Sequence, residues 1–376
     1  MSVCGHAHAP LNVKIMRLER IVIDQVRNLN EVNINLSARL NILFGENASG
    51  KTSFLESLHL LAYARSFRSH HFKHIVNRDA DYLRVTGQIA GSGHQTVPVG
   101  VEFRDGRLRM RAEGKSLKKT SELAQYLPII IIHQECQRLL TDGPKFRRKF
   151  LDWGVFHVEP GFLKAWRRYV RVLRQRNAVL QSGRGRRTDV SVWDQEFKEC
   201  ALAIHEFRQS YCGRFIPVLK NCLEQILDDS KDISVAYNPG WDTSQDFLTI
   251  LEAAYELDSR RGFTHRGPHR ADISVKSAGV AAHENLSRGQ QKLLICAMLI
   301  AQALVYRQHS GKPCVFLVDD LKAELDQEHV ERVMALLEGV DAQIIMTATD
   351  KEALAPFCFT GHKTFHVERG RVTEVV

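Results

Sequence analysis

The N-terminal third of the chain changes from a strand pattern to a helical pattern and back. Apolar residues recur at short period over residues 16–44, which predicts strands, and from Thr52 they take helical spacing. The turn pair Asp105-Gly106 predicts a hairpin between two of the strands that follow. These later strand-like segments are Leu83–Ala90, Val97–Phe103, Leu108–Ala112 and Pro128–His133.

Residues 145–260 have a mostly helical pattern, and prolines are expected to break it at 144, 160, 217 and 239. No heptad pattern continues across these prolines, which argues against a long coiled coil. From about residue 272 the chain again alternates between strand and helix patterns, and it ends with a short strand pair. The expected elements are strand Asp272–Lys276, helix 287–307, strand 314–319, helix 326–338 and strand 343–347.

Strand–helix–strand order at both ends of the chain predicts an α/β domain that is built from the two termini. The helical middle would then be an insertion. The expected division is an N-terminal extension at 1–15, the first part of a head domain at 16–135, a helical basic arm at 136–265, and the second part of the head at 266–376.

Composition is that of an ordinary soluble globular protein, with 376 residues, 44% apolar and 25% charged. Lys and Arg (52) exceed Asp and Glu (43), a net charge of +9 that favours a polyanionic partner, either nucleic acid or an anionic membrane surface. No apolar run is long enough to cross a bilayer, and residues 1–15 do not resemble a signal peptide. The eight cysteines lack any C-x-x-C pair, so we expect free thiols and a cytoplasmic protein.

A phosphate-binding loop is predicted between an apolar strand and a helix, where the sequence matches G-x-x-x-x-G-K-[ST]. In such a loop, backbone N–H groups and the helix N-terminus surround the phosphates. Lys51 would reach the β- and γ-phosphates, and Thr52 would ligate Mg²⁺. The matching residues are Gly45, Glu46, Asn47, Ala48, Ser49, Gly50, Lys51 and Thr52.

A second strand, residues 314–319, ends in two carboxylates. Burying carboxylates is costly unless a cation or hydrogen bonds compensate the charge. We therefore expect Asp319 to hold Mg²⁺, directly or through water, and Asp320 to orient the attacking water as a general base. The alternative is a strand that simply ends in a polar turn.

A further motif, L-S-R-G-Q at residues 286–290, opens a long apolar helix. A serine alone would be weak evidence for a functional motif, because serine is a common N-cap residue. In this position the motif resembles the signature of ABC-type ATPase heads, whose Ser and helix N-terminus bind the γ-phosphate held by the opposite protomer. Residues 323–326 are similar to their D-loop. The resemblance implies an ABC-type P-loop ATPase head with an inserted helical arm.

Within that class the chain resembles the RecF family of bacterial recombination mediators, which are related to the heads of structural-maintenance-of-chromosomes proteins. The similarity runs from Met16 to near the C-terminus and rests on R-N-L at 27–29, R-S-F-R-S at 65–69, G-P-K-F-R-R-K-F-L-D-W at 143–153, G-P-H-R-A-D at 267–272 and V-D-D-L-K-A-E-L-D at 318–326. The family implies ATP-dependent dimerisation, binding to single- and double-stranded DNA, and slow DNA-stimulated ATP hydrolysis. It also implies work with RecR and RecO to place RecA on gapped DNA.

The resemblance also suggests further contacts to nucleotide: Ser287, Gly289, Gln290, Asp326, Arg27 and Gln134. For Arg27 a purely structural role remains an alternative. Gln134 stands at the expected Q-loop, where the family favours Pro before an acidic residue. Asp320 replaces the Glu of most ABC heads, and the switch position carries Thr347 in place of His. The shorter carboxylate favours a slow switch over a motor.

The positive charge is concentrated in residues 145–187, which hold thirteen basic side chains against Asp152 and Glu159. Trp166, Tyr169, Val170 and Leu173 follow helical spacing and predict an apolar face, with the basic residues on a separate face. Such a helix suits contact with a phosphate backbone, which positions the protein without reading sequence. The candidate DNA contacts are Arg147, Arg148, Lys164, Arg167, Arg168 and Arg171.

Three alternatives stay open. The basic helix face could be solvated and paired with acidic neighbours, and Arg147 and Arg148 could serve the head. The chain could be the nucleotide-binding subunit of a membrane transporter, although the catalytic Glu and switch His of that class are replaced. It could also be a DNA-binding scaffold with a vestigial nucleotide pocket, although Lys51, Thr52, Asp319, Asp320 and Ser287 are all intact.

Overall fold

The computed structural model describes residues 17–91, 95–182, 187–228, 230–323, 325–349 and 361–375. Internal contacts divide the chain into two units. Unit 1 comprises residues 1–133, 311–323 and 337–376, and unit 2 comprises residues 134–310 and 324–336. The expected extension at 1–15 lies outside the described residues, as do Arg184 and Arg186 of the basic segment.

Unit 1 contains a mainly parallel sheet with the strand order β15-β14-β3-β13-β12-β8, in which only β15 runs antiparallel to its neighbour. Every residue of β12 and β13 is buried. A parallel strand covered on both faces carries a continuous apolar run, which explains the unbroken run in β12. The strands are β3 (Leu40–Phe44), β8 (Ile129–Ile132), β12 (Val315–Val318), β13 (Gln343–Ala348), β14 (Lys363–Glu368) and β15 (Arg371–Val375).

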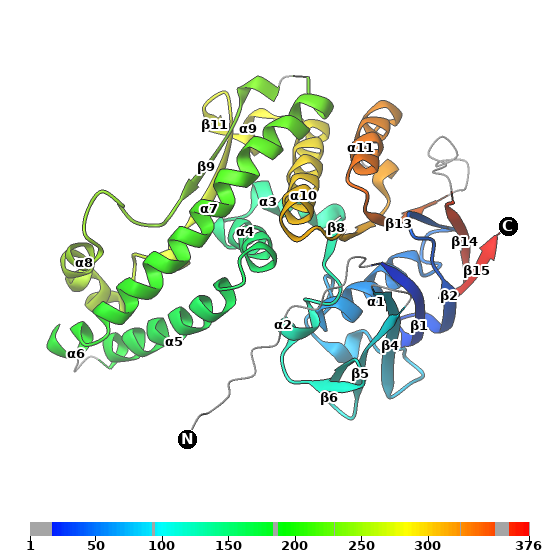
Figure 1. Cartoon of the computed structure of the whole chain (residues 1–376), viewed down its shortest axis with the longest axis horizontal. Helices are drawn as coiled ribbons and strands as arrows, with labels where there is room; N and C mark the ends of the chain where they lie inside the picture. Colours follow the sequence, from blue (N-terminus) through cyan, green and yellow to red (C-terminus); the bar gives the residue numbers. More distant parts are fainter. Residues whose placement is uncertain are drawn as a thin grey trace. The chain divides into compact units, whose positions relative to one another are not determined.

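A second, antiparallel sheet in unit 1 has the order β2-β1-β4-β5-β6-β7 (Figure 1). The predicted hairpin is confirmed, because β5 pairs with β6 around Asp105 and Gly106, which both have positive φ. The strands are β1 (Leu18–Val26), β2 (Leu29–Asn35), β4 (Tyr82–Ala90), β5 (Thr96–Arg104), β6 (Arg107–Ala112) and β7 (Lys115–Leu117). The helical elements of unit 1 are α1 (Lys51–Tyr63), η1 (Phe72–His74), α2 (Thr120–Leu123) and η6 (Leu321–Ala323).

Unit 2 is mostly helical and carries a small antiparallel sheet, β11-β10-β9 (Figure 1). Its helices are α3 (Arg138–Thr141), α4 (Pro144–Val158), α5 (Phe162–Gln181), α6 (Arg187–Ser191), α7 (Asp194–Ile226), α8 (Phe247–Arg261), α9 (Ala282–Asn285), α10 (Arg288–Ser310) and most of α11 (Gln327–Gly339). Its strands are β9 (Ile233–Asn238), β10 (Asp272–Ser277) and β11 (Val280–Ala281), and its 3₁₀ turns are η3 (Gln134–Gln137), η4 (Ser230–Asp232) and η5 (Pro268–Arg270).

The predicted break at Pro217 is wrong, because α7 continues through this residue. A proline removes one intrahelical hydrogen bond, and the buried side chains of Phe215 and Leu219 on either side hold the helix in place. Pro144, in contrast, begins α4, where its missing N–H costs nothing.

The helix that follows the L-S-R-G-Q motif, α10, groups with unit 2, whereas the sequence placed residues 266–376 together in the head. It packs along α7 and α4, and the Gln302 side-chain amide donates to Phe150 O at 2.8 Å. Within the described residues α10 is long and apolar enough to span a membrane, but 83% of that stretch is buried inside the protein. It is therefore the core helix of unit 2.

Candidate nucleotide site and basic arm

The loop from Gly45 to Thr52 connects β3 to α1 in a conformation that requires glycine twice. Gly45 has φ 153°, and a Cβ there would lie 2.2 Å from Val367 O. Gly50 has φ 126°, and its Cβ would lie 2.9 Å from Leu29 Cδ2. Both φ values disfavour residues that have a side chain, so this loop conformation requires glycine at both positions. The loop therefore forms a glycine cradle.

Neighbouring segments hold this loop from outside. The Asn28 side-chain amide donates to Ala48 O at 3.1 Å and accepts from Ser53 Oγ at 3.0 Å. The Gly370 backbone amide donates to Ser49 O at 2.9 Å. Asn28 is a residue that sequence reasoning missed, although it stands in the R-N-L motif from which only Arg27 was selected.

The cradle presents donors suited to phosphate. The first intrahelical bond of α1 runs from the Phe54 amide to Gly50 O at 2.9 Å, so the amides of residues 51–53 have no partner within the helix. Ser49 Oγ is buried, and no described residue bonds to it. Lys51 Nζ donates to the carbonyls of Gly45 (2.6 Å) and Glu46 (2.8 Å). These groups fit the phosphates of ATP.

Electrostatics around Lys51 combine burial with two nearby carboxylates. Burial lowers the pKa of Lys51, and the negative charges of Asp320 and Asp319 act in the opposite direction. The ammonium is therefore placed between the loop and the two aspartates, which is where it can bridge to phosphate oxygens.

A set of hard oxygen ligands faces the loop. Thr52 Oγ1 lies 3.2 Å from both carboxylate oxygens of Asp319, and Thr347 Oγ1 donates to Asp319 Oδ1 at 2.8 Å. Hydroxyl and carboxylate oxygens are the protein ligands that Mg²⁺ accepts beside substrate phosphates. The residues present therefore fit Mg²⁺ at the point where the sequence placed it.

Asp320 follows β12 in a left-handed conformation, with φ 47°. A non-glycine residue is strained there and must be held by its surroundings. Two bonds provide that restraint, because the Asp320 amide donates to Thr347 Oγ1 at 3.0 Å and the Asp319 amide donates to Ile132 O at 2.9 Å. Gln134, the Q-loop candidate, comes two residues after Ile132 and is exposed.

Arg27 pairs with a buried carboxylate. Its Nε and a terminal nitrogen donate to the two oxygens of Glu56 at 3.0 and 2.9 Å, and its remaining nitrogen donates to His74 O. Glu56 is fully buried, and it also accepts from Ser66 Oγ and lies 3.5 Å from Arg68. The structure therefore gives Arg27 the structural role that the sequence left as an alternative to nucleotide contact.

The signature residues form the N-terminus of α10 in unit 2. Ser287 Oγ accepts from the Gln290 amide at 3.3 Å, and the Gln290 side chain accepts from the Ser287 amide at 3.0 Å. This reciprocal pair is a capping box. Ser287 is exposed, and Gly289 and Gln290 are half-buried, so the end of the helix is open to a ligand from solvent.

Asp326 caps the N-terminus of α11. Its carboxylate accepts from the His329 amide at 3.0 Å and contacts His329 Nδ1 at 2.7 Å. These hydrogen bonds lower the pKa of the Asp326 carboxyl. The carboxylate itself is exposed.

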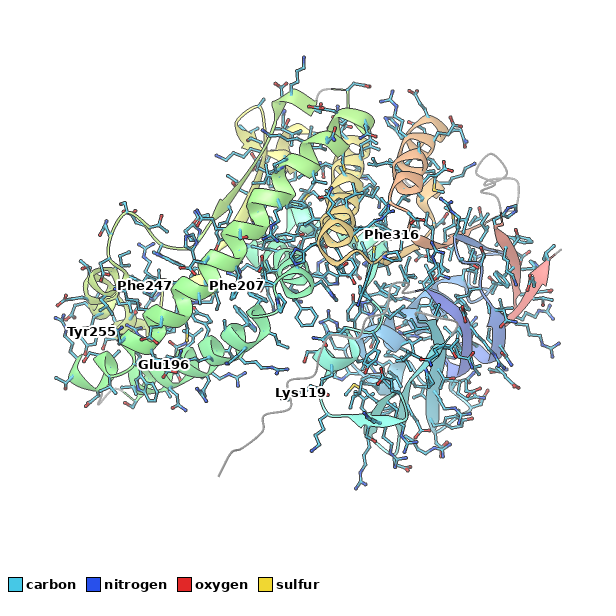
Figure 2. The ribbon with its side chains drawn as sticks, in the orientation of Figure 1. Lys119, Glu196, Phe207, Phe247, Tyr255 and Phe316 are labelled. Carbon is cyan, nitrogen blue, oxygen red and sulfur yellow. The ribbon has the colours of Figure 1, made fainter. Side chains whose placement is uncertain are left out.

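Helix α5 carries the predicted basic face, and Lys164, Arg167, Arg168 and Arg171 are all exposed. Arg168 contacts Glu196 (2.7 Å) and Glu199 (3.2 Å) on α7, and Arg171 lies 3.8 Å from Glu196. Glu196 is labelled in Figure 2. Part of this face is therefore paired with acidic neighbours.

The predicted apolar face of α5 is only partly correct. Tyr169 is fully buried, whereas Trp166, Val170 and Leu173 are half-buried. The side chains buried along α5 are Phe162, Tyr169, Val172, Arg176 and Leu180. Val170 instead lines an open groove of about 400 Å³ together with Trp166, Arg167, Arg171, Arg174 and Gln175. Arg176 belongs to this buried stripe and is bonded to Asp194 and Asp258.

Arg147 and Arg148 on α4 have structural partners within unit 2. Arg147 forms a two-pronged pair with Asp272, at 2.7 and 2.9 Å, and only 15% of its side chain is exposed. Arg148 donates to Ala271 O at 2.8 Å. The pairing of Arg147 corresponds to the alternative in which it does not face DNA.

Comparisons with known proteins agree over nearly the whole chain. The RecF/RecN/SMC N-terminal domain family matches residues 17–371. The DNA replication and repair protein RecF of Cellvibrio japonicus is 38% identical over 363 residues, 95% of this chain and 99% of that protein. RecF of Vibrio cholerae is 40% identical over 367 residues, 96% of this chain and 100% of that protein.

Solved structures show the same fold. A structure of the recombination mediator protein RecF with ATP, in the RecFOR pathway, matches with a TM-score of 0.84 at 24% identity and covers 99% of this chain and 100% of that one. An Smc head bound to the C-terminal winged-helix domain of ScpA matches less closely, with a TM-score of 0.57 at 16% identity, covering 96% of this chain and 97% of that one. The fold is therefore the ABC-type ATPase head, and the chain belongs to the RecF family of DNA replication and repair proteins.

Proposed function

We propose that the protein is an ATP-dependent DNA-binding protein of recombinational repair and replication-fork maintenance. In this proposal ATP and Mg²⁺ bind at the loop after β3, the ATP-bound form dimerises and holds DNA, and slow hydrolysis resets it. The observation that carries the proposal is the joint geometry of Lys51, Thr52 and Asp319 beside a glycine cradle in a chain of this family.

Each residue of the nucleotide site has a proposed task. The amides of residues 51–53, Ser49 Oγ and Lys51 bind phosphate oxygens, and Thr52 and Asp319 hold Mg²⁺. Asp320 orients the attacking water. We propose nucleotide contact for Gln134 only because the family resemblance suggests it. The Asp320 side chain is shorter than glutamate by one methylene, so it positions water less well and turnover is slow.

The signature motif would complete the site of a second copy. In the capping box Ser287 is exposed and Gln290 is half-buried, which leaves the positive end of α10 free for the γ-phosphate held by another chain. Gly289 allows close approach, and Asp326 would lie beside the same nucleotide. Each chain gives one Lys51 and one Ser287, so the dimer is isologous.

We assign DNA contact to the exposed basic residues of α5, principally Arg167 and Arg171. Successive basic residues along one helix face lie about 5–6 Å apart, which suits successive backbone phosphates. A relative's structure is described as part of the RecFOR pathway. We propose by extension that this chain works in the cytoplasm with RecR and RecO, helps to load RecA on gapped DNA, and requires no membrane.

Light scattering tests the proposal most directly. The mass of wild-type protein is measured with Mg²⁺ and either ADP or ATP, beside Lys51→Ala and Ser287→Arg. We expect a dimer only in ATP, no dimer for either variant, and retained ATP binding for Ser287→Arg, because its own phosphate loop is intact. Ser191→Arg, an exposed serine on α6, is the matched control and should dimerise.

Two outcomes would contradict the proposal. A monomer in both nucleotides, with DNA present as well as absent, would remove the dimer. Dimerisation of Ser287→Arg equal to wild type would remove the composite site.

A further inference from the structure

The open groove on α5 combines an aromatic surface with charged side chains. One side of α5 packs on α7, which runs beside it (Figure 1), and the groove of about 400 Å³ lies on a side that is open to solvent. Trp166 and Val170 are one helical turn apart and form the apolar part of its lining. The polar part of the lining is Arg167, Arg171, Arg174 and Gln175.

Trp166 is fixed from inside the protein. The Arg208 guanidinium carbon lies 5.5 Å from the centre of the Trp166 ring, and the Tyr169 ring centre lies 5.7 Å away. Arg208 and Tyr169 are both fully buried, whereas Trp166 is half-buried. The indole is therefore anchored on one part, and another part lines the groove. An anchored aromatic side chain loses little further rotamer entropy when a ligand packs against it.

The rim of the groove is positively charged. Among the residues that the structure describes, those that line the groove include three arginines and no acidic side chain. Glu196 on α7 lies 3.8 Å from Arg171 and balances part of this charge, but the Arg171 side chain remains 70% exposed. Arg174, almost one turn further along α5, is also exposed. Both guanidinium groups can therefore pair with a ligand phosphate.

This set of side chains matches the three parts of a nucleotide. An aromatic ring packs against the face of a base, a guanidinium group pairs with its phosphate, and the Gln175 amide offers a donor and an acceptor to the base edge. The volume is within the range of roughly 300–1,000 Å³ in which proteins hold small ligands. In a duplex the base faces are covered by neighbouring bases, so only an unpaired nucleotide can use the aromatic surface.

We propose that the α5 groove binds an unpaired nucleotide of single-stranded DNA, with its base against Trp166 and Val170 and its phosphate beside Arg171 and Arg174. The inference rests on the proposed function, because it requires that the chain binds DNA, and it names the part of the DNA that α5 recognises. A basic helix face alone holds the backbone of a single strand or of a duplex. The groove adds a preference for the single-stranded part of a gap.

Three fluorescein-labelled DNA probes of equal length test the groove: a thymidine single strand, a strand of abasic sugar-phosphate units, and a duplex. Fluorescence anisotropy measures their affinity across a KCl titration with Mg²⁺-ATP. Wild-type protein should bind the thymidine strand about 5- to 100-fold more tightly than the abasic strand, because packing of a base on an aromatic ring contributes that much.

Trp166→Leu should lose this preference. Its affinity for the thymidine strand should fall by the same factor, whereas its affinity for the abasic strand and the duplex should stay at the wild-type value. The slope of log affinity against log salt should not change, because no charge is removed. Trp166→Phe keeps an aromatic ring and should retain most of the preference.

Arg174→Gln tests the phosphate contact separately. It should reduce the salt slope by about one on both single strands, because one phosphate contact is lost, and it should leave the preference for thymidine over abasic DNA intact. Arg174 is exposed, so this variant should fold. An unchanged slope would remove Arg174 from the proposed site.

Trp193→Leu is the matched control, because Trp193 is also a half-buried tryptophan of unit 2 but does not line the groove. It should bind all three probes like wild type. The melting temperature and the affinity for a fluorescent ATP analogue check that Trp166→Leu is folded. If it does not fold, the wild-type comparison still decides, because equal affinity for the thymidine and abasic strands would overturn the base contact.

The outcomes also separate this inference from the proposed function. If wild-type protein binds neither DNA nor ATP, the proposed function fails. If wild-type protein binds both, and folded Trp166→Leu binds the thymidine strand as tightly as wild type does, only the nucleotide groove is overturned. An equal loss of affinity for the duplex and the single strand in Trp166→Leu would also contradict the groove, because the contact would then not depend on an unpaired base.

Discussion

Thr347 Oγ1 donates a hydrogen bond to Asp319 Oδ1 at 2.8 Å. The same hydroxyl accepts from the Asp320 amide at 3.0 Å, so one side chain on β13 holds both acidic residues at the end of β12. The two strands are adjacent and parallel, with Val318 beside Met346. Thr347 therefore holds the Asp319 carboxylate and the Asp320 backbone amide from the adjacent strand.

Replacing Thr347 by valine should weaken Mg²⁺-dependent ATP binding by roughly 10- to 100-fold, because a hydrogen bond to a charged carboxylate contributes roughly 1.5–3 kcal/mol. Titrating Mg²⁺ at fixed ATP measures the effect. Thr347→Ser keeps the hydroxyl and should behave like wild type. A valine variant whose titration overlays that of wild type would show that Thr347 does not position Asp319.

Removing Arg27 should mainly affect stability. Arg27→Ala leaves the buried carboxylate of Glu56 with Arg68 and Ser66 only, at an expected cost of roughly 3 kcal/mol in the free energy of unfolding. Urea denaturation measures this cost, and Arg65→Ala, at an exposed arginine, is the control. ATP affinity of the folded variant should stay at the wild-type value. A large loss of affinity without a loss of stability would instead support the nucleotide contact that the sequence suggested.

The basic face of α5 should contribute to DNA binding through its exposed arginines. Reversing Arg167 and Arg171 to glutamate should lower the salt slope of DNA binding by about two, while ATP binding persists. Arg168→Glu should instead lower stability, because it brings like charges beside Glu196. Unchanged affinity of the double reversal across a KCl titration would argue that this face is only solvated.

Two glycines in helices should respond in opposite directions to alanine. In an exposed helix the change stabilises by up to about 1 kcal/mol, and at Gly213 on α7 a Cβ meets no atom within 4 Å. At Gly154 on α4 a Cβ would lie 2.2 Å from the Tyr211 ring, so Gly154→Ala should destabilise by roughly 1–3 kcal/mol. Thermal melting of the two variants compares them directly, and equal shifts would mean that α4 moves away from α7 at little cost.

Acid should destabilise the protein below about pH 6.5, through histidines that are neutral when folded. Burial lowers the pKa of His269 to about 4, and the pKa values of His59 and His157 to about 3. In this range the unfolded chain binds more protons, so stability is complete above about pH 6.5 and falls as the pH falls toward 4. Each histidine contributes about 1.4 kcal/mol per pH unit.

Urea denaturation at several pH values measures this slope. His157→Phe should reduce it by about one proton, because the ring lies among Trp153, Phe156 and Tyr306, where a phenyl group fits. A slope in the variant equal to that of wild type would show that His157 is already protonated when folded.

Much of the fold follows from local pattern. The unbroken apolar runs of β8 and β12 are typical of a parallel sheet that is covered on both faces, and the hairpin at Asp105-Gly106 follows from its turn residues. The order of strands and helices can therefore be predicted from the sequence. Pro217 was misread, because a local rule cannot include the packing that keeps α7 continuous.

The contacts between side chains that are distant in sequence could not be predicted. No pattern along the chain indicates that Arg27 meets Glu56, that Arg147 meets Asp272, or that Arg176 enters the buried stripe of α5. Asn28 was missed for the same reason, because its contact with the phosphate loop joins β-strand ends that are distant in sequence. From the sequence alone, an arginine that faces solvent cannot be distinguished from one that pairs with a buried carboxylate.

By itself the sequence determines the phosphate loop, the paired aspartates and the family, because each depends on residue types at fixed spacing within one short segment. Only the tertiary structure decides which arginines remain available for an anion, because that depends on carboxylates delivered by other elements. Arg147 and Arg208 are taken by Asp272 and Asp152, whereas Lys164 on α5 is exposed. That difference is a balance of charge in space, and it exists only once the chain has folded.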